Sequence, residues 1–280
     1  MVSIVFGLAT AVFFASSGLM ASRSVKVIGS WSTVAWTMLV GLVIVLPFLM
    51  FSGVPDEIGD NIGWMVAAGT GNVAGLVLVG LAFRVGKVGV VAPIAATEGA
   101  IAAVIAAILG ESIAPIVAFL LLAIVMGIVI SAIAPDPEPL DHEQPVAAVL
   151  LATAGALAFG VSLYAAGSLS GDLPIPWVLL PARLVGVVAL AIPLALTRRL
   201  LITRPMVPLI LGMGLAEVLG FVCFAIGAQY QVAVTSVLAS QFAPIAAVMA
   251  YVLFRERLGR LQIAGVTVLV VAVTALTLAS

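Results

Sequence analysis

The stretch GTGNVAG at residues 69–75 returns 145 residues later as GLAEVLG at residues 214–220, and this recurrence decides the fold. In each copy a polar side chain lies midway between the first and the last glycine, Asn72 in the first copy and Glu217 in the second. The same shift aligns three further pairs, Phe14 with Phe159, Ser17 with Ser162, and Glu111 with Glu256. Chance similarity between helices rich in Gly, Ala and Val is the alternative. Because one shift fits residues spread over most of each half, the chain is predicted to contain an internal repeat.

The sequence around these stretches is apolar almost throughout. Of the 280 residues, 64% are hydrophobic and 8% are charged, whereas soluble domains carry about 25% charged residues. A helix that crosses a membrane needs about 20 apolar residues. Charged and Gly/Pro-rich turns divide the chain into ten such runs: 3–21, 32–52, 63–83, 88–109, 114–133, 147–168, 175–196, 207–227, 231–253 and 261–279. Because these runs are continuously apolar, they predict helices and not the alternating strands of a membrane barrel.

Five of the predicted helices fall in each half of the chain. Because five is odd, the second half must enter the membrane from the opposite side. The sequence thus predicts an all-α integral membrane protein whose ten transmembrane helices form two inverted five-helix repeats, residues 1–133 and residues 147–280. Residues 134–146, which hold four prolines, are predicted to link the two repeats.

The distribution of charged residues supports this arrangement. Ten of the 11 Lys and Arg residues fall in loops on one face of the predicted bundle: Arg23, Lys26, Arg84, Lys87, Arg198, Arg199, Arg204, Arg255, Arg257 and Arg260. The opposite face receives acidic side chains: Asp56, Glu57, Asp60, Glu111 and Asp172. Loops rich in Lys and Arg stay in the cytoplasm, so both chain termini are expected outside it. The predicted location is the cytoplasmic (inner) membrane, which the chain crosses many times.

Composition excludes several classes of function. The net charge of -1 leaves no basic surface for nucleic acid. The single cysteine, Cys223, cannot form an internal disulfide. The single histidine, His142, cannot build a zinc site alone, and it lies in the linker, where no nucleophile–base arrangement is seen. No metal, cofactor or enzymatic activity is therefore expected. The expected partners are the lipid bilayer and a small-molecule substrate.

Short motifs lie at or near the fourth, ninth and tenth predicted helices, and the order of motifs is the same in the two halves. They are GKVGVVAP at residues 86–93, Gly110-Glu111, RERL at residues 255–258, and Gly265 in the tenth helix. Together with the repeat, they resemble the EamA-type branch of the drug/metabolite transporter superfamily. The resemblance implies a ten-helix inverted-repeat bundle with a central cavity lined by helices 1, 3, 4, 6, 8 and 9. It also implies transport or export of small metabolites, often amino acids.

Three ionisable side chains fall deep inside predicted helices, where a charge costs about 2.5–3.5 kcal/mol. Glu98 is expected at the centre of the fourth helix and has no carboxylate counterpart in the second half. It can bind a substrate ammonium or carry a proton, and the alternative is a protonated Glu98 bonded to a backbone carbonyl. Glu217, aligned with Asn72, is predicted either to bind substrate or to hold helices together. Arg183 is predicted to pair with Glu217 or with Glu98, or to reach the outer face.

Smaller polar and aromatic side chains near the same depth complete the predicted substrate site. They are Ser17, Ser162, Tyr164, Phe14, Ser240 and Gln241, with Ser236 and Ser240 on one stripe of the ninth helix. The aromatic rings can surround a cationic group, and ordinary helix packing is the alternative for the whole set. The fifth and tenth helices carry almost no polar side chains, so they are expected to face lipid or a second copy. The chain is predicted to be a monomer, or a homodimer through these two helices.

The predicted function is that of a secondary transporter, because mid-membrane carboxylates and inverted repeats occur together in such proteins. The expected substrate is a small polar metabolite, either an amino acid or an amine, moved by alternating access with proton coupling as one option. The alternatives are transport of a quaternary ammonium compound, a drug or a lipid intermediate, and a membrane scaffold or sensor that transports nothing.

Overall fold

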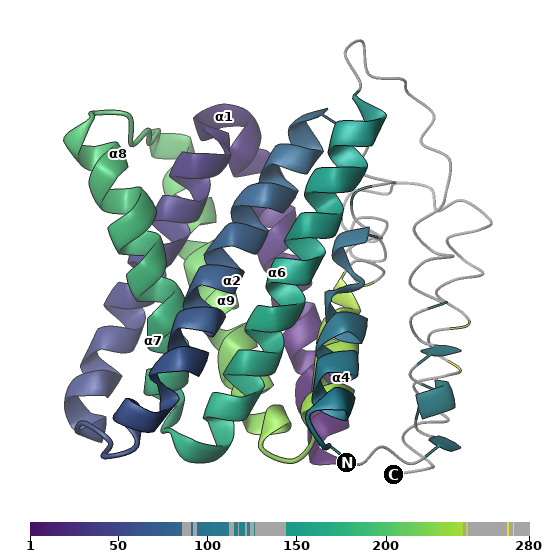
Figure 1. Cartoon of the computed structure of the whole chain (residues 1–280). Coiled ribbons are helices and arrows are strands. Elements are labelled where there is room, and N and C mark those ends of the chain that lie inside the picture. The colour runs from purple at the N-terminus through teal and green to yellow at the C-terminus, as the bar shows by residue number, and fades with distance from the viewer. Residues whose placement is uncertain are drawn as a thin grey trace.

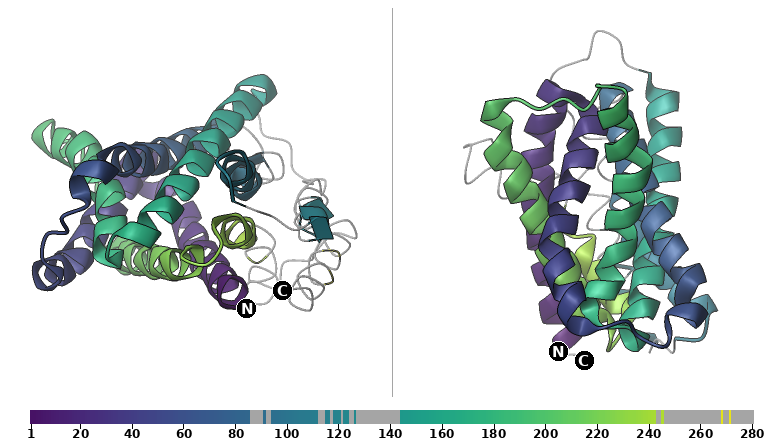
Figure 2. Two further views of the ribbon diagram at one scale, coloured as in Figure 1. Left: turned by 60° about the horizontal axis from the view of Figure 1, so that its bottom comes forward. Right: turned by 90° about the vertical axis from the view of Figure 1, so that its left-hand side faces the viewer.

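A computed structural model describes residues 1–85, 91, 94–111, 115–116, 118–120, 122–123, 126, 144–242, 245, 268 and 271 of the chain. These residues form helices and connecting turns, with no strand among them. The described helices run side by side along one axis, as Figures 1 and 2 show. The predicted all-helical class is thus confirmed for this part of the chain.

The first three predicted spans are present as helices. Helix α1, Val2–Ser52, holds two segments able to cross a membrane, Val2–Val25 and Val27–Ser52. The chain reverses between them near Gly29, whose φ of 80° and ψ of 160° lie outside the helical range. Glycine adopts such angles readily because it has no Cβ. Helix α2, Ile58–Val85, then returns across the bundle (Figure 1).

Three further spans lie in the second half of the chain. Their elements are α6 (Pro145–Asp172), α7 (Ile175–Gly186), η1 (Val187–Ala191), α8 (Ile192–Leu196), η2 (Arg204–Met206) and α9 (Val207–Ala228). The elements α7, η1 and α8 are continuous, and together they form one span. The widened π-helical turn η1 comes directly before Pro193, whose ring nitrogen has no hydrogen to donate to the preceding turn.

Six helical segments of the described residues are long and apolar enough to cross a membrane, and each coincides with a predicted span. The protein is therefore a multi-pass membrane protein. The fifth and tenth predicted helices, 114–133 and 261–279, lie almost wholly outside the described residues, and so does most of the predicted linker at 134–146. The expected dimer surface on those two helices therefore lies outside the described residues as well.

The fourth and ninth predicted helices are interrupted near their middle. Helix α4, Glu98–Ile108, begins after a turn at residues 96–97. Helix α10, Val232–Ala239, ends in a turn at residues 240–241. The sequence predicted continuous runs here, with Glu98 at the centre of one of them. In the structure Glu98 is instead the first residue of a helix.

A hydroxyl group accompanies each interruption. Thr97 Oγ1 donates a hydrogen bond to the carbonyl oxygen of Ile94 at 2.6 Å, and Ser240 Oγ donates to the carbonyl oxygen of Val237 at 2.8 Å. Both bonds reach back three residues, and such side-chain bonds compete with the regular helical pattern. The two interruptions therefore have a common local cause that apolar periodicity does not reveal.

Equivalent residues of the two halves make equivalent helix contacts. Helix α2 packs against α6, and α9 packs against α1. A Cβ added to Gly75 would lie 2.5 Å from the ring of Phe159, and one added to Gly220 would lie 2.6 Å from the ring of Phe14. The two glycines, like the two phenylalanines, are 145 residues apart. Small residues at both places let the helix backbones approach closely.

The loops that follow the second span of each half also correspond. Gly53 and Arg198, again 145 residues apart, both have positive φ angles, 68° and 55°. At one end of the bundle, Trp177 Nε1 donates to the carbonyl oxygen of Gly53 at 2.8 Å. At the other end, Ser32 Oγ donates to the carbonyl oxygen of Arg199 at 3.4 Å. Each loop is thus bonded to a residue near the start of the opposite half's second span.

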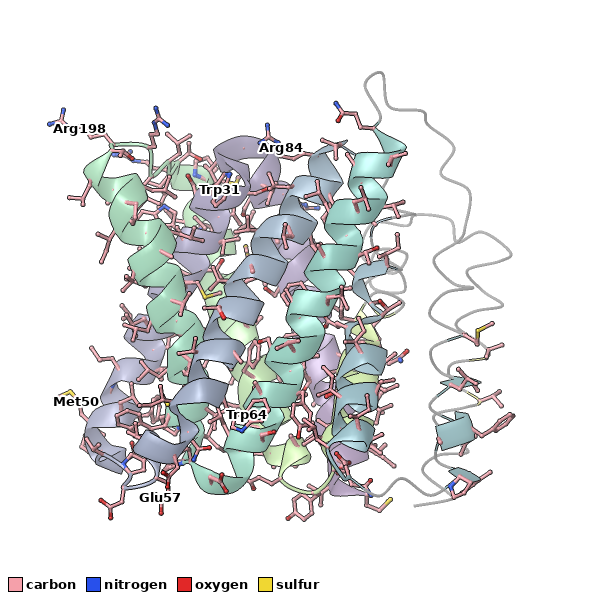
Figure 3. All side chains as sticks on the ribbon, in the orientation of Figure 1. Trp31, Met50, Glu57, Trp64, Arg84 and Arg198 are labelled. Atoms are coloured by element: carbon pink, nitrogen blue, oxygen red, sulfur yellow. The ribbon has the colours of Figure 1, made fainter. Side chains whose placement is uncertain are left out.

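Charged loop residues gather at opposite ends of the bundle. Arg84 and Arg198 lie at one end and Glu57 lies at the other, as Figure 3 shows. The N-terminus lies at the end that carries Glu57 (Figure 1). Trp31 marks the basic end and Trp64 the acidic end (Figure 3), where amphipathic rings are common at the membrane surface.

Candidate functional site

A buried ion pair lies between α7 and α9. Arg183 Nη1 is 3.3 Å from Glu217 Oε1, and the exposed fractions of the two side chains are 1% and 8%. The sequence left both Glu217 and Glu98 open as partners of Arg183, and the structure places it against Glu217. Two opposite charges of this kind are far less costly to bury together than either charge is alone.

Three residues that sequence reasoning did not single out surround this guanidinium group. Its Nη1 lies 3.8 Å from Met38 Sδ, and its Cζ lies 5.2 Å from the centre of the Phe221 ring. A Cβ added to Gly41 would lie 2.8 Å from Arg183 Nε. Phe221 carries a sequence signal, since it follows Glu217 by one helical turn. Met38 and Gly41 belong to a helix far from Arg183 in the sequence, so no sequence pattern indicated that they contact it.

Glu98 lies buried at the start of α4, with 5% of its surface exposed. Its neighbours are close, because a Cβ added to Gly160 of α6 would lie 3.1 Å from the Glu98 carbonyl oxygen. The next residue, Gly99, packs against the carbonyl group of Ser236 on α10. Within the described part of the chain, the Glu98 carboxylate has no hydrogen bond or ion pair. Among the described residues, Glu98 is therefore a buried carboxylate without a bonding partner.

The end of α10 brings further polar groups to the same crossing of helices. Ser240 Oγ would lie 2.6 Å from a Cβ added to Gly99. Gln241 is fully buried, and its Nε2 donates to the carbonyl oxygen of Val237 at 3.0 Å. The Oε1 atom of Gln241 and the Oγ atom of Ser236 are buried without a hydrogen-bond partner among the described residues. The predicted residues Glu98, Ser240 and Gln241 therefore gather where α4 and α10 cross.

Asn72 and Ser162 lie on the neighbouring helices α2 and α6. Ser162 Oγ donates to the carbonyl oxygen of Ala68 at 2.7 Å, which joins the two helices. Asn72 is buried, and its Oδ1 atom has no hydrogen-bond partner. Ser162 thus has a structural bond, whereas the Asn72 acceptor has no partner among the residues that the structure describes.

The remaining predicted residues are half-buried. The ring of Phe14 lies 5.2 Å from that of Phe221, and the Phe221 ring in turn contacts Arg183. The ring of Tyr164 instead lies 5.5 Å from that of Trp64 in an edge-on arrangement, toward the acidic end. Ser17 is half-buried on α1. The structure thus places Phe14 against Phe221, which neighbours the ion pair, and Tyr164 against Trp64.

Two groups of polar residues therefore stand out, one around the ion pair and one around Glu98. A shared hydrophobic cluster connects them, because it contains Phe221 and also Ala102, which lies one turn after Glu98. Among the residues that the structure describes, no three His, Cys, Asp or Glu side chains are placed to hold a metal ion.

The bundle of apolar helices with ionisable groups buried between them defines a multi-pass membrane protein with a polar interior. Residues 1–133 match the EamA-like transporter family. This match confirms the resemblance of the chain to the EamA-type branch of the drug/metabolite transporter superfamily. The family indicates a membrane transporter.

Solved structures support the same fold. Twenty-five chains of solved structures match this one. One of them, described as "Crystal structure of protein", shares 17% sequence identity with a TM-score of 0.79. The match covers 99% of this chain and 96% of the other, so the likeness in fold extends over nearly the whole length. No curated protein sequence matches this chain.

Proposed function

We propose that this protein is a secondary transporter that moves an amino acid or an amine across the cytoplasmic membrane by alternating access. The family match supports a transporter of the drug/metabolite type. The observation that carries the finer proposal is the contrast between two buried carboxylates. Glu217 is engaged by Arg183, whereas Glu98 has no bonding partner in the described part of the chain.

An unengaged carboxylate inside a membrane protein needs a positive partner or a proton. Glu98 lies among helices rather than at the lipid surface, so that partner must enter through the protein interior. A substrate ammonium group provides the opposite charge, and a proton provides the alternative when substrate is absent. Glu98 is thus the proposed group that exchanges a cationic or zwitterionic substrate for a proton.

Alternating access requires a framework that can rock about the site. The proposed framework is two inverted five-helix repeats, residues 1–133 and 147–280, with ten helices in all. The equivalent contacts of Gly75 with Phe159 and of Gly220 with Phe14 support it. So do the paired interruptions before Glu98 and after Ala239, which occupy similar positions in the two halves.

The orientation in the membrane follows from the same arrangement. Arg84 and Arg198 lie at one end of the bundle and Glu57 at the other (Figure 3). The positive-inside rule assigns the basic end to the cytoplasm. The N-terminus lies at the acidic end (Figure 1), so both termini are proposed to lie outside the cytoplasm. The proposed location of the protein is the inner membrane.

Ligand binding to the purified full chain tests the proposal. The melting temperature is measured with amino acids, primary amines and quaternary ammonium compounds, because a ligand that binds the folded state raises it. Compounds with an ammonium group should stabilise the wild type and the Glu57→Gln control, whose changed residue is exposed. They should not stabilise Glu98→Gln. Equal stabilisation of Glu98→Gln and wild type would refute the role of Glu98.

A further inference from the structure

Arg183 has hydrogen-bond donors that no described residue of the protein uses. Its Nη1 atom contacts Glu217 Oε1 and Met38 Sδ. Its Nε and Nη2 atoms are buried and have no hydrogen-bond partner in the described part of the chain. Arg183 is also the largest fully buried side chain among the described residues, so these two donors are closed off from bulk water. A buried charged donor without an acceptor is costly, which points to an acceptor that comes and goes.

The two unused donors form one edge of the guanidinium group. The N–H bonds of Nε and Nη2 point in nearly the same direction, at a spacing that matches the two oxygens of a carboxylate. Glu217 takes the opposite corner through a single oxygen. The ion pair therefore leaves the bidentate edge of Arg183 free, and a lysine at this position would have no such edge.

The surroundings hold the guanidinium group in one orientation. Gly41 lies directly against Nε and Cδ, where an added Cβ would come within 2.8 Å and 2.9 Å. Phe221 lies 5.2 Å from Cζ and offers the face of its ring. Glu217 fixes Nη1 on the third side. The free edge is thus preorganised, which favours binding because little side-chain freedom is lost.

We propose that the Nε and Nη2 edge of Arg183 binds the carboxylate of the transported molecule. This inference rests on the proposed transport function and narrows its substrate class to molecules that carry a carboxylate. A zwitterion provides the carboxylate for Arg183 together with the ammonium group that the proposed function requires. A zwitterion also adds no net charge to the interior, whereas a simple anion would add one beside Glu217.

Three matched ligands distinguish binding of the substrate's carboxylate from binding of its ammonium group. L-Valine carries both charged groups, valinamide carries only the ammonium group, and isovalerate carries only the carboxylate. Their dissociation constants are measured for the full chain as wild type, Arg183→Lys and the control Arg199→Lys, whose side chain is exposed in a loop. Arg183→Lys keeps the positive charge beside Glu217 and lacks the bidentate edge.

Arg183→Lys should weaken binding of L-valine and isovalerate by about 10-fold or more. It should leave valinamide binding unchanged, and Arg199→Lys should behave as wild type with all three ligands. The proposal is overturned if Arg183→Lys binds the two carboxylates as well as wild type does. It is overturned equally if neither carboxylate binds the wild type.

A second variant covers the case in which Arg183→Lys fails to fold. Arg183→Gln combined with Glu217→Gln removes both charges together and should fold, yet lose binding of isovalerate. The failures of the two proposals are distinguishable through Glu98→Gln. If Glu98→Gln loses valinamide while the Arg183 variants keep isovalerate, the proposed function stands and the carboxylate site does not.

Discussion

Arg183 Nη1 lies 3.3 Å from Glu217 Oε1, and this contact joins α7 to α9 inside the bundle. The two residues are the charged pair at the centre of a packed region that includes Phe221 and Gly41. Neither charge has another ionic partner among the described residues. Each residue therefore depends on the other for its place in the membrane interior.

Removing one member of this pair should destabilise the protein strongly. Glu217→Gln leaves the Arg183 charge buried without compensation, which should lower the free energy of unfolding by about 3–5 kcal/mol. The double variant Arg183→Gln with Glu217→Gln should recover most of that loss. Denaturant unfolding of the purified chain in detergent measures all the variants in one double-mutant cycle. Losses that simply add up would mean that the two side chains do not interact.

The equivalent glycine contacts should respond alike to substitution. Gly75→Ala and Gly220→Ala each force a Cβ against a phenylalanine ring, so each should lower stability by about 1–3 kcal/mol. Gly18→Ala is the matched control, because its added Cβ meets no atom within 4 Å. This control should be neutral or stabilising by up to about 1 kcal/mol. Tolerance of alanine at one of the two equivalent glycines would argue against equivalent packing of the halves.

Glu111 should produce a pH-dependent contribution to stability. Its carboxylate accepts hydrogen bonds from the backbone N–H of Ala233 at 3.2 and 3.3 Å, at the start of α10. Burial raises the pKa of Glu111, and the backbone hydrogen bonds from Ala233 and Val232 oppose that rise. Because the folded state then binds the proton more tightly than the unfolded state, this contribution falls as pH rises through the raised pKa.

Glu111→Gln keeps an oxygen acceptor for Ala233 and removes the titration. Melting temperatures of wild type and Glu111→Gln, measured from acidic to neutral pH, should diverge in slope, with the wild type losing relative stability as pH rises. Glu111→Ala removes the acceptor as well and should cost about 0.5–2 kcal/mol, as loss of a helix cap does. Parallel pH profiles for wild type and Glu111→Gln would show that Glu111 does not titrate in this way.

Much of the fold was predictable because the apolar runs are long and their ends carry charges. All six described spans coincide with predicted ones for this reason. The interruptions at residues 96–97 and 240–241 were not predicted. They depend on the hydroxyl groups of Thr97 and Ser240 bonding to nearby carbonyls, and such bonds leave no mark on the apolar pattern.

The candidate site was predictable in its residue types but not in its contacts. Glu98, Arg183 and Glu217 lie deep inside predicted spans, where a charged side chain costs free energy, so each is a candidate functional residue. It does not determine which way each helix is turned, so the partner of Arg183 stayed open between two glutamates. The close approach of Gly41 depends on packing between helices far apart in the sequence, and a single sequence holds no signal for it.

Reporter fusions at Ser280 test the proposed orientation. A phosphatase that is active only outside the cytoplasm should be active there, because the positive-inside rule places both termini on the acidic side. A fluorescent reporter that matures only in the cytoplasm should stay dark at the same position. Bright fluorescence at Ser280 would contradict the proposed orientation.

The most direct measurement is the pH dependence of ligand binding in wild type and Glu98→Gln. An ammonium-bearing ligand identified by thermal shift is titrated into the purified chain from mildly acidic to mildly basic pH. If Glu98 exchanges a proton for the ligand, wild-type affinity should rise with pH as the carboxylate loses its proton, and the affinity of Glu98→Gln should be lower and flat. The same rise with pH in Glu98→Gln would contradict the exchange at Glu98.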